Sequence, residues 1–304
     1  MSFKYIDLFA GIGGFHQAAS LLSGQCVFAS EINDEARKAY SLNYGFSPAG
    51  DITKINAKDI PDHDFLFAGF PCQPFSIIGN QLGFNDIRGT LFFEIARILK
   101  EKQPNMFILE NVKQLTTHNN GMTLNVILDQ LQKCGYKVFW SVLNALDFNL
   151  PQKRERIIIV GFLNNDIDFI FPNIKSHWDL KSILESDEDI DPKHFVSAHI
   201  LQKRLSKHQS MFNPAIWHEN KSGNISSYPY SCALRAGASY NYLLVNGKRR
   251  LTPREMLRLQ GFSDSFKIVC SDFQTRRQAG NAVPVNIIAA VLQAMIEIKN
   301  KIKP

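Results

Sequence analysis

Residues 5–15 read YIDLFAGIGGF, and this stretch decides how the chain begins to fold. Tyr5–Phe9 is a short run of apolar and β-forming residues, which predicts a buried strand, and the glycines after it open a helix. Glycines in such a turn let the backbone approach a ligand closely, and the start of the helix offers unpaired amide groups. The third glycine comes too early for the pattern Gly-x-Gly-x-x-Gly. A tight connection between strand and helix therefore remains the alternative to a ligand site.

The first half of the chain alternates short β-rich runs with segments of helical periodicity. We expect strands at Tyr5–Phe9, Cys26–Ser30, Asp64–Ala68, Met106–Glu110, Val138–Leu143 and Ile157–Phe162. Between them, apolar residues recur at helical spacing at Leu91, Ile95, Ile98 and Leu99, and again at Leu124, Ile127, Leu128 and Leu131. This alternation is typical of an α/β fold, in which helices cover a parallel sheet and each packs one apolar face on it.

The alternation stops after Phe162, and residues 163–247 are irregular in sequence. A loop of this length without secondary structure of its own is improbable in a compact protein, so we expect a small second domain there. Helical periodicity returns at Thr252–Gln260 and at Val285–Ile298. The predicted organisation is therefore a first domain over residues 1–162, a second over 163–247, and a segment 248–304 that returns to the first.

The composition is that of an ordinary folded protein: 45% of the 304 residues are hydrophobic and 20% are charged. No apolar run approaches the ~20 residues that span a bilayer, and the first residues lack the features of a secretory signal. We therefore expect a soluble, cytoplasmic protein. The five cysteines are widely spaced and include no Cys-x-x-Cys pair, which argues against a zinc site or a disulfide framework.

Charge is distributed unevenly along the chain. Residues 1–150 carry a net charge of −2 and residues 151–304 a net charge of +8, which together give the overall +6. The second half is thus predicted to meet a polyanion. A basic surface that merely keeps the protein soluble is an equally good interpretation of so modest an excess.

Two motifs follow predicted strands and carry reactive groups. Residues 69–76 read GFPCQPFS, so Cys72 lies in a loop at the carboxyl end of a parallel strand, where open α/β sheets bind ligands. Such a thiol is a candidate nucleophile, although a loop cysteine is more often simply packed. Glu110, at the end of the next strand, is expected at the same edge of the sheet. It is either a buried acid or a group that solvates the strand end.

For two further groups of charged residues, a purely structural role is the alternative to a binding role. Glu31 ends the second strand, where a carboxylate could bind a ribose diol or supply negative charge to the helix that begins near Asn33. Arg154 and Arg156 are alternate residues before the last strand, so we expect their side chains to point the same way. They form either an anion-binding pair or a solvated edge.

Taken in order, these motifs resemble a known family. The set is DLFAGIGGF, Glu31, Gly50-Asp51-Ile52, GFPCQPFS, RGTLFFE, ENV, QKRERI, RRLTPREMLRLQGF and QAGNAVPVN. It resembles the DNA cytosine-5 methyltransferases of bacterial restriction–modification systems, almost continuously over residues 4–162 and 248–292. The resemblance implies a Rossmann-like sheet of the S-adenosylmethionine-dependent methyltransferase type. It also implies that residues 163–247, where the likeness is poor, form a small target recognition domain of mostly β or irregular structure.

The resemblance also implies a mechanism. The thiolate of Cys72 would add to carbon 6 of a flipped-out cytosine, because carbon 5 is otherwise too poor a nucleophile to accept a methyl group. Glu110 would hydrogen-bond to ring nitrogen 3 and the exocyclic amine, and Arg156 with Arg154 would hold the carbonyl oxygen and a nearby phosphate.

For the cofactor S-adenosylmethionine, the family pattern implies a set of contacts. These are Phe9 on the adenine, Glu31 on the ribose, Asp51 and Ile52 at the adenine edge, Gly11, Gly13, Asn281 and Val283 at the methionine end, and Leu91. Two positions depart from the family. Ile32 replaces a tryptophan that helps to sandwich the adenine, so stacking should be weaker, and Ala233-Leu234 stands where Thr-Leu is common.

The implied partner is double-stranded DNA, with a cognate restriction endonuclease acting on the same site, and the protein is expected to be a monomer without a metal. Candidate DNA contacts are Gln73, Ser76, Arg235, Arg249 and Arg250. A tRNA cytosine-5 methyltransferase is the main alternative, although the Cys-Phe-Thr tripeptide of that branch is absent. A nicotinamide oxidoreductase would leave the Pro-Cys-Gln loop and the paired arginines unexplained. The intact nucleophile and acid argue against a non-catalytic DNA-binding module.

Overall fold

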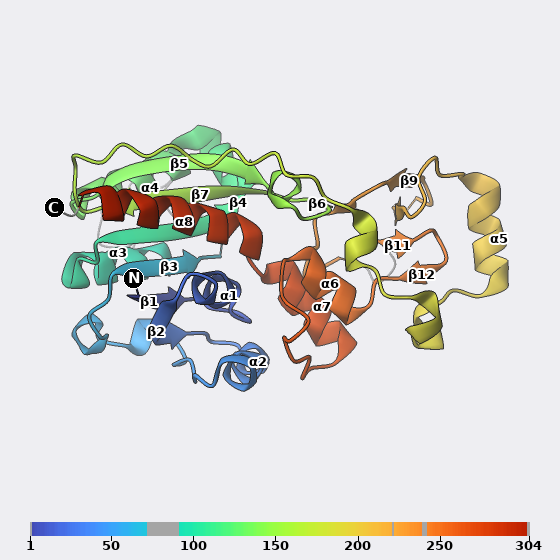
Figure 1. Cartoon of the computed structure of the whole chain (residues 1–304), viewed down its shortest axis with the longest axis horizontal. Coiled ribbons are helices and arrows are strands. Elements are labelled where there is room, and N and C mark those ends of the chain that lie inside the picture. The colour runs from blue at the N-terminus through green and yellow to red at the C-terminus, as the bar shows by residue number, and fades with distance from the viewer. Residues whose placement is uncertain (1, 72–90, 221, 239–241, 303–304) are drawn as a thin grey trace. The chain divides into compact units, whose positions relative to one another are not determined.

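The computed structural model describes residues 2–71, 91–220, 222–238 and 242–302. The chain divides into two compact units (Figure 1). The first unit comprises Met1–Leu143, Glu155–Pro172 and Ile287–Pro304, and the second comprises Asn144–Arg154 and Asn173–Asn286. Of the C-terminal segment defined from the sequence, residues 248–286 thus belong to the second unit and residues 287–304 to the first.

A six-stranded sheet forms the centre of the first unit, in the order β2-β1-β3-β4-β7-β5. Its strands are β1 (Phe3–Leu8), β2 (Gly24–Ser30), β3 (Phe65–Gly69), β4 (Met106–Val112), β5 (Lys137–Asn144) and β7 (Glu155–Phe162). Each of the six predicted strands is confirmed to within two residues at either end.

The sheet departs from the predicted parallel arrangement in one strand. β2, β1, β3 and β4 pair in parallel, but β7 pairs antiparallel with β4, from Met106 opposite Phe162 to Val112 opposite Arg156. Only residues 145–154 connect β5 to its neighbour β7. A parallel neighbour needs a longer crossover, usually a helix, so the chain returns in the opposite direction.

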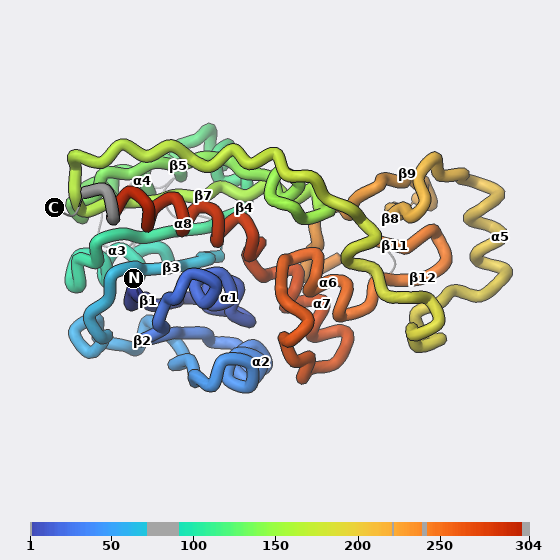
Figure 2. Tube along the Cα trace, in the orientation of Figure 1, coloured from blue at the N-terminus to red at the C-terminus, as the bar shows by residue number. Residues whose placement is uncertain are grey.

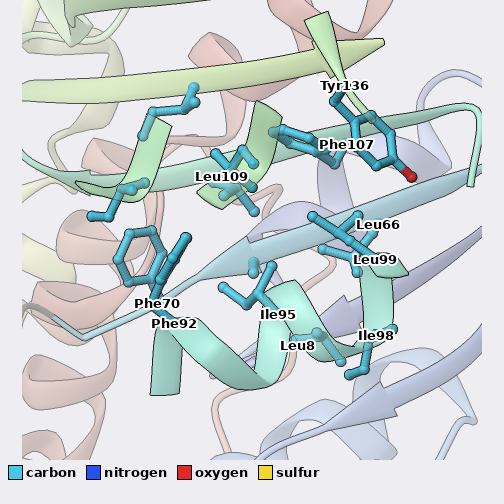
Figure 3. Close-up of a cluster of buried hydrophobic side chains, with 14 of the residues drawn as sticks. Leu8, Leu66, Phe70, Phe92, Ile95, Ile98, Leu99, Phe107, Leu109 and Tyr136 are labelled. Carbon is cyan, nitrogen blue, oxygen red and sulfur yellow. The ribbon is translucent and has the colours of Figure 1, made fainter. Parts of the chain in front are cut away.

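Helices cover one face of the sheet with a continuous apolar core. α3 (Leu91–Lys102) buries Phe92, Ile95, Ile98 and Leu99, and α4 (Met122–Lys133) buries Leu124, Ile127 and Leu131. These side chains pack against sheet residues that include Leu8, Leu66, Phe107 and Leu109 (Figure 3). The predicted apolar faces are confirmed except at Leu91 of α3 and Leu128 of α4, which are only partly buried. This core fixes the carboxyl ends of β3 and β4 relative to each other.

The other face of the sheet carries α1 (Gly14–Ser20) and α8 (Val285–Ile302). Phe15 of α1 stacks on Phe67 with the ring centroids 5.4 Å apart. Near the other end of the chain, Lys299 of α8 donates a hydrogen bond to Asp64, so the C-terminal helix lies beside the start of β3 (Figure 2). α2 (Asp34–Tyr44) begins directly after Asn33, near the predicted start, and the side chain of Asn33 caps it.

The second unit is built from short elements. Its four-stranded antiparallel sheet has the order β12-β11-β8-β9, and β6 pairs in parallel with β10. The strands are β6 (Gln152–Lys153), β8 (Ile216–Glu219), β9 (Ile225–Tyr228), β10 (Ser231–Cys232), β11 (Leu244–Val245) and β12 (Arg249–Arg250). The helices are α5 (Ala198–Lys207), α6 (Pro253–Leu259) and α7 (Asp272–Asn281).

Short 3₁₀ helices complete both units. They are η1 (Ile52–Lys54), η2 (Ala57–Asp59), η4 (Lys113–Thr116), η5 (His118–Gly121), η6 (Ala145–Phe148), η7 (Leu180–Ile183), η8 (Asp187–Asp189) and η9 (Pro192–His194).

One stretch among the described residues, Asp272–Lys299, has the length and apolar composition of a membrane span, although the sequence predicted none. It corresponds to α7 and most of α8, and 61% of its apolar 18-residue window is buried inside the protein. The apolar residues of α8, from Val285 to Met295, pack in the protein interior. We therefore assign this stretch to the protein core.

Candidate active site

The end of strand β4 carries a buried acid held by an arginine. Glu110 lies opposite Gly69 of β3 and Ile158 of β7, and its Oε1 is 2.8 Å from Nε of Arg156. Both side chains are largely shielded from solvent. A charge-assisted hydrogen bond of this kind fixes the orientation of the carboxyl group at the sheet edge. The structure thus brings together two of the four predicted catalytic residues.

Asn111, the next residue, connects this acid to the loop that contains Cys72. Its Nδ2 donates to the backbone carbonyl of Phe70 over 3.0 Å, and its Oδ1 accepts from the amide of Val112 over 2.8 Å. Cys72 itself lies outside the described residues. Because Asn111 is buried, the hydrogen bond from its Nδ2 fixes the carbonyl of Phe70, two residues before Cys72. The sequence analysis missed this residue, although the tripeptide Glu-Asn-Val contains it.

The glycine turn after β1 is tied to the end of β2 by Glu31. The carboxylate accepts from the amide of Gly11 and from that of Asn33, each over 2.8 Å. Gly11 has a φ of +56°, and a Cβ built on it would meet no described atom within 4 Å. Gly13 has a φ of +84°, and a Cβ there would lie 2.3 Å from the ring of Tyr44. Both positions therefore need glycine, and the turn leaves open space at Gly11.

The other predicted cofactor residues of the first unit have different environments. Phe9 has a positive φ of 55° and packs partly on the core. Ile32 is 71% exposed, whereas Ile52 is buried in the core. The carboxylate of Asp51 accepts from the hydroxyl and amide of Thr53, and these hydrogen bonds lower its pKa. Leu91 begins α3. Asn281 and Val283 belong to the second unit.

Behind the glycine turn lies a buried acid to which the sequence analysis assigned no role. Asp7 is fully buried, and neither carboxylate oxygen has a hydrogen-bond partner among the described residues. Burial, and then the charge of Glu31, raise its pKa well above the ordinary value. Nearby His16, which bonds Tyr40 through Nδ1 over 2.7 Å, has its pKa lowered to about 4 by burial. Burial thus shifts both pKa values toward the neutral form of each side chain.

Arg154 and Arg156 have different partners, since Arg156 binds Glu110 and Arg154 binds backbone carbonyls. Arg154 lies in the second unit, is 1% exposed, and donates to the carbonyls of Leu234, Gly280 and Ala282 over 2.9 to 3.1 Å. Its guanidinium therefore binds backbone carbonyls of the second unit.

The predicted DNA contacts have different environments. Arg249 is 1% exposed, and its guanidinium is bound by the carboxylates of Glu255 and Asp187. Arg250 is half-buried and donates to the carbonyl of Lys193. Arg235 is exposed, and its guanidinium lies 5.0 Å from the centre of the Tyr242 ring. Gln73 and Ser76 lie outside the described residues. In the part of the chain that the structure describes, no three potential metal ligands gather.

Comparison with known proteins identifies the family. The profile of the C-5 cytosine-specific DNA methylases matches residues 3–297. The type II methyltransferase M.NgoBI of Neisseria gonorrhoeae is 56% identical over 95% of this chain and 91% of its own length. M.HaeII of Haemophilus aegyptius is 55% identical over 98% and 94%, and M.HhaI of Haemophilus parahaemolyticus is 39% identical over 94% and 91%.

The fold agrees with this assignment. The crystal structure of the S. pombe Dnmt2 methyltransferase superposes with a TM-score of 0.73 at 22% identity, covering 99% of this chain and 100% of that one. At such low identity the likeness concerns the fold. Together with the sequence relatives, it shows that this chain belongs to the family of C-5 cytosine-specific DNA methyltransferases.

Proposed function

We propose that this DNA cytosine-5 methyltransferase works through a covalent adduct of Cys72 with a flipped-out cytosine in a short, specific duplex site. We also propose that it is the protective methylase of a type II restriction–modification system. One observation above all supports the first proposal. Glu110, fixed by Arg156, is followed directly by Asn111, which holds the chain two residues before Cys72. The acid and Phe70, two residues before the proposed nucleophile, thus lie at one sheet edge.

The proposed chemistry assigns one step to each group. The thiolate of Cys72 adds to carbon 6 of cytosine, which makes carbon 5 nucleophilic. Glu110 donates a hydrogen bond to ring nitrogen 3, so that the charge developing on the ring is stabilised where it forms. After methylation, loss of the proton on carbon 5 and cleavage of the bond between carbon 6 and sulfur release the product. The base reaches these groups only outside the duplex stack.

Features of the first unit fit S-adenosylmethionine, the methyl donor of this family. Space is open at Gly11, the start of α1 offers backbone amides, and Ile32 is exposed beside the carboxylate of Glu31. The bound donor supplies a methyl group on a sulfonium, which carbon 5 attacks. We propose that Phe9, Gly13, Asp51, Ile52 and Leu91 complete the cofactor contacts of the first unit.

The remaining parts of the proposal concern DNA and cellular context. We propose that residues 163–247 contain the target recognition domain, and that Gln73, Ser76, Arg235 and Arg250 contact DNA. For Arg249 we propose a structural ion pair instead, because two carboxylates already bind its buried guanidinium. We further propose that the protein acts as a monomer on nucleoid DNA in the cytoplasm, alongside an endonuclease that cuts the same site.

The central test uses labelled S-adenosylmethionine with duplex DNA and with tRNA. Label should enter the DNA, and Cys72→Ser should abolish incorporation, while Cys270→Ser serves as a matched control outside the site. Duplex containing 5-fluorocytosine should trap an adduct on Cys72 that mass spectrometry detects. Label in tRNA alone would replace the proposal with an RNA methyltransferase, and the absence of an adduct on Cys72 would remove the mechanism.

A further inference from the structure

A short irregular segment of the second unit, residues 233–238, is held in place by side chains from distant parts of the chain. We call it the reading segment. The amide of Leu234 donates to Oε1 of Gln152, and the carbonyl of Leu234 accepts from Nη1 of Arg154, each over 2.9 Å. Both side chains are almost completely buried. Two side chains thus satisfy the polar backbone groups of Leu234, as a strand partner would elsewhere.

Tyr242 holds the residues on either side of Leu234. Its hydroxyl accepts from the amide of Arg235 over 2.9 Å and donates to the carbonyl of Ala233 over 3.2 Å. Further along, Nη1 of Arg276 donates to the carbonyl of Ala238 over 2.9 Å. The reading segment is therefore held at three consecutive residues and again near its end.

α7 also contacts the reading segment. A Cβ added at Gly280 would lie 2.4 Å from the amide nitrogen of Ala236, so the two backbones are in close contact. The holding side chains are themselves fixed. Gln152 also donates to the carbonyl of Leu259 over 2.8 Å, and Arg154 also donates to the carbonyls of Gly280 and Ala282. Each of these two side chains is thus bound at more than one point, which restricts where Leu234 can lie.

The reading segment, held in this way, carries an exposed cation, Arg235. Arg235 projects from the reading segment, with its guanidinium over the Tyr242 ring whose hydroxyl binds its own amide. Stacking reduces the freedom of the side chain while leaving its edge donors available. Arg235 and Tyr242 also line a pocket together with Arg250 and Arg276. Arginine in such a setting matches the paired acceptors O6 and N7 of guanine in the major groove.

We propose that Arg235 reads a guanine in the target site, and that Gln152, Arg154 and Tyr242 are positioning residues that determine where its guanidinium lies. The inference rests on the proposed action on duplex DNA. It assigns Arg154 to sequence recognition, acting through the backbone of Leu234, whereas Arg156 remains beside Glu110. A buried hydrogen-bond network of this kind serves recognition, because a shift of about 1 Å in the position of a donor would disrupt the bidentate hydrogen bonds to a base.

The test selects bound duplexes from a randomised pool with the full-length protein and sequences them. Arg235→Gln should reduce the preference for guanine at one position by about 5- to 150-fold and leave the other positions unchanged. Tyr242→Phe keeps the ring but removes the bridging hydroxyl, and should weaken the same preference to a smaller extent. Arg154→Lys should do likewise, and if that variant does not fold, Tyr242→Phe decides.

Arg277→Gln is the matched control, because Arg277 is also exposed and lies over an aromatic ring, 5.9 Å from the centre of Phe273. It should leave every base preference as it is. Uniform weakening by Arg235→Gln, with a salt slope reduced by about 1, would show a phosphate contact and overturn guanine reading. An unchanged profile in Tyr242→Phe would overturn the positioning role.

Selection by binding needs no methyl transfer, so the two proposals fail separately. A wild-type protein that selects a guanine-containing site without methylating it would refute the proposed function and leave this inference intact. If the wild-type protein methylates a specific site and Arg235→Gln leaves every base preference unchanged, this inference is refuted and the proposed function stands.

Discussion

At the scale of single residues, Asn111 offers a test of how the nucleophile loop is positioned. Asn111→Ala removes the donor to the Phe70 carbonyl, so the loop root can shift relative to Glu110. Misplacement by about 1 Å can cost on the order of 100-fold in rate, and we expect a 10- to 100-fold slower trapping of 5-fluorocytosine DNA. Binding of S-adenosylhomocysteine should not change. Asn105→Ala, before the opposite end of β4, is the control, and equal rates in both variants would contradict this role.

Asp7 predicts a dependence of stability on pH. Its pKa is raised in the folded state, so the folded protein keeps a proton that the unfolded chain loses, and stability falls as pH rises above about 4. Asp7→Asn mimics the protonated form. The variant should therefore gain stability over wild type by up to about 1.4 kcal/mol per pH unit above about pH 4, until the folded-state pKa is reached.

Urea unfolding of both proteins between pH 4 and 8 measures this difference. His16 acts in the opposite sense, because its pKa is lowered to about 4 and stability rises with pH as the imidazole of the unfolded chain loses its proton. That contribution is common to wild type and Asp7→Asn, so it cancels in the comparison. A difference in stability that is constant across pH would mean that Asp7 is ionised in the folded protein.

At the scale of elements, local patterns predicted the strands but not all of their connections. β3 and β4 read as continuous apolar runs because both faces are buried, and the apolar spacing of α3 and α4 marked the helices that cover them. The direction of β7 depends on how few residues separate it from β5. The partners of Arg154 are 80 to 128 residues away in sequence, and no local period encodes them.

The same distinction applies to the candidate site. Motifs pointed to Glu110 and Arg156, whose ion pair the structure shows. They could not indicate that Asn111 binds Phe70, a contact across 41 residues, or that Asp7 is buried without a partner. Each of these depends on the packed sheet, in which residues that are distant in sequence lie side by side.

The start of α6 predicts a large loss of stability from one substitution. Glu255 is buried and accepts from both terminal nitrogens of Arg249 and from the amides of Thr252 and Glu185, all over 2.9 Å. Glu255→Gln removes a negative charge that compensates the buried guanidinium of Arg249. Breaking such a buried pair typically lowers the free energy of unfolding by about 3–5 kcal/mol. Asp264→Asn breaks the ion pair of Arg258 with a carboxylate that is 65% exposed and should cost less than about 1 kcal/mol.

Denaturant unfolding compares the two variants at pH 7. Glu255→Gln should lower the unfolding midpoint far more than Asp264→Asn, with little change in the slope of the transition. Equal effects of the two substitutions would show that the network around Arg249 contributes no more than a surface ion pair.

At the scale of the whole molecule, charge separates the two units. The second unit has 18 lysines and arginines against 11 acidic residues, a net charge of +7, whereas the first unit has a net charge of −1. Binding of DNA should therefore depend on cations of the second unit, and binding of the cofactor product should not.

Each phosphate that is neutralised contributes about −0.9 to the slope of log affinity against log salt concentration. Fluorescence anisotropy with labelled duplex between 50 and 200 mM KCl should give a steep negative slope, because bound counterions are released from the DNA. Calorimetry with S-adenosylhomocysteine over the same range should give a slope near zero.

Replacing Lys203 and Lys207 of α5 with Gln tests which part of the second unit contributes. If the DNA slope is unchanged in that variant, the phosphate contacts lie elsewhere in the unit. If the wild-type slope is itself near zero, the positive charge of the second unit does not serve DNA binding.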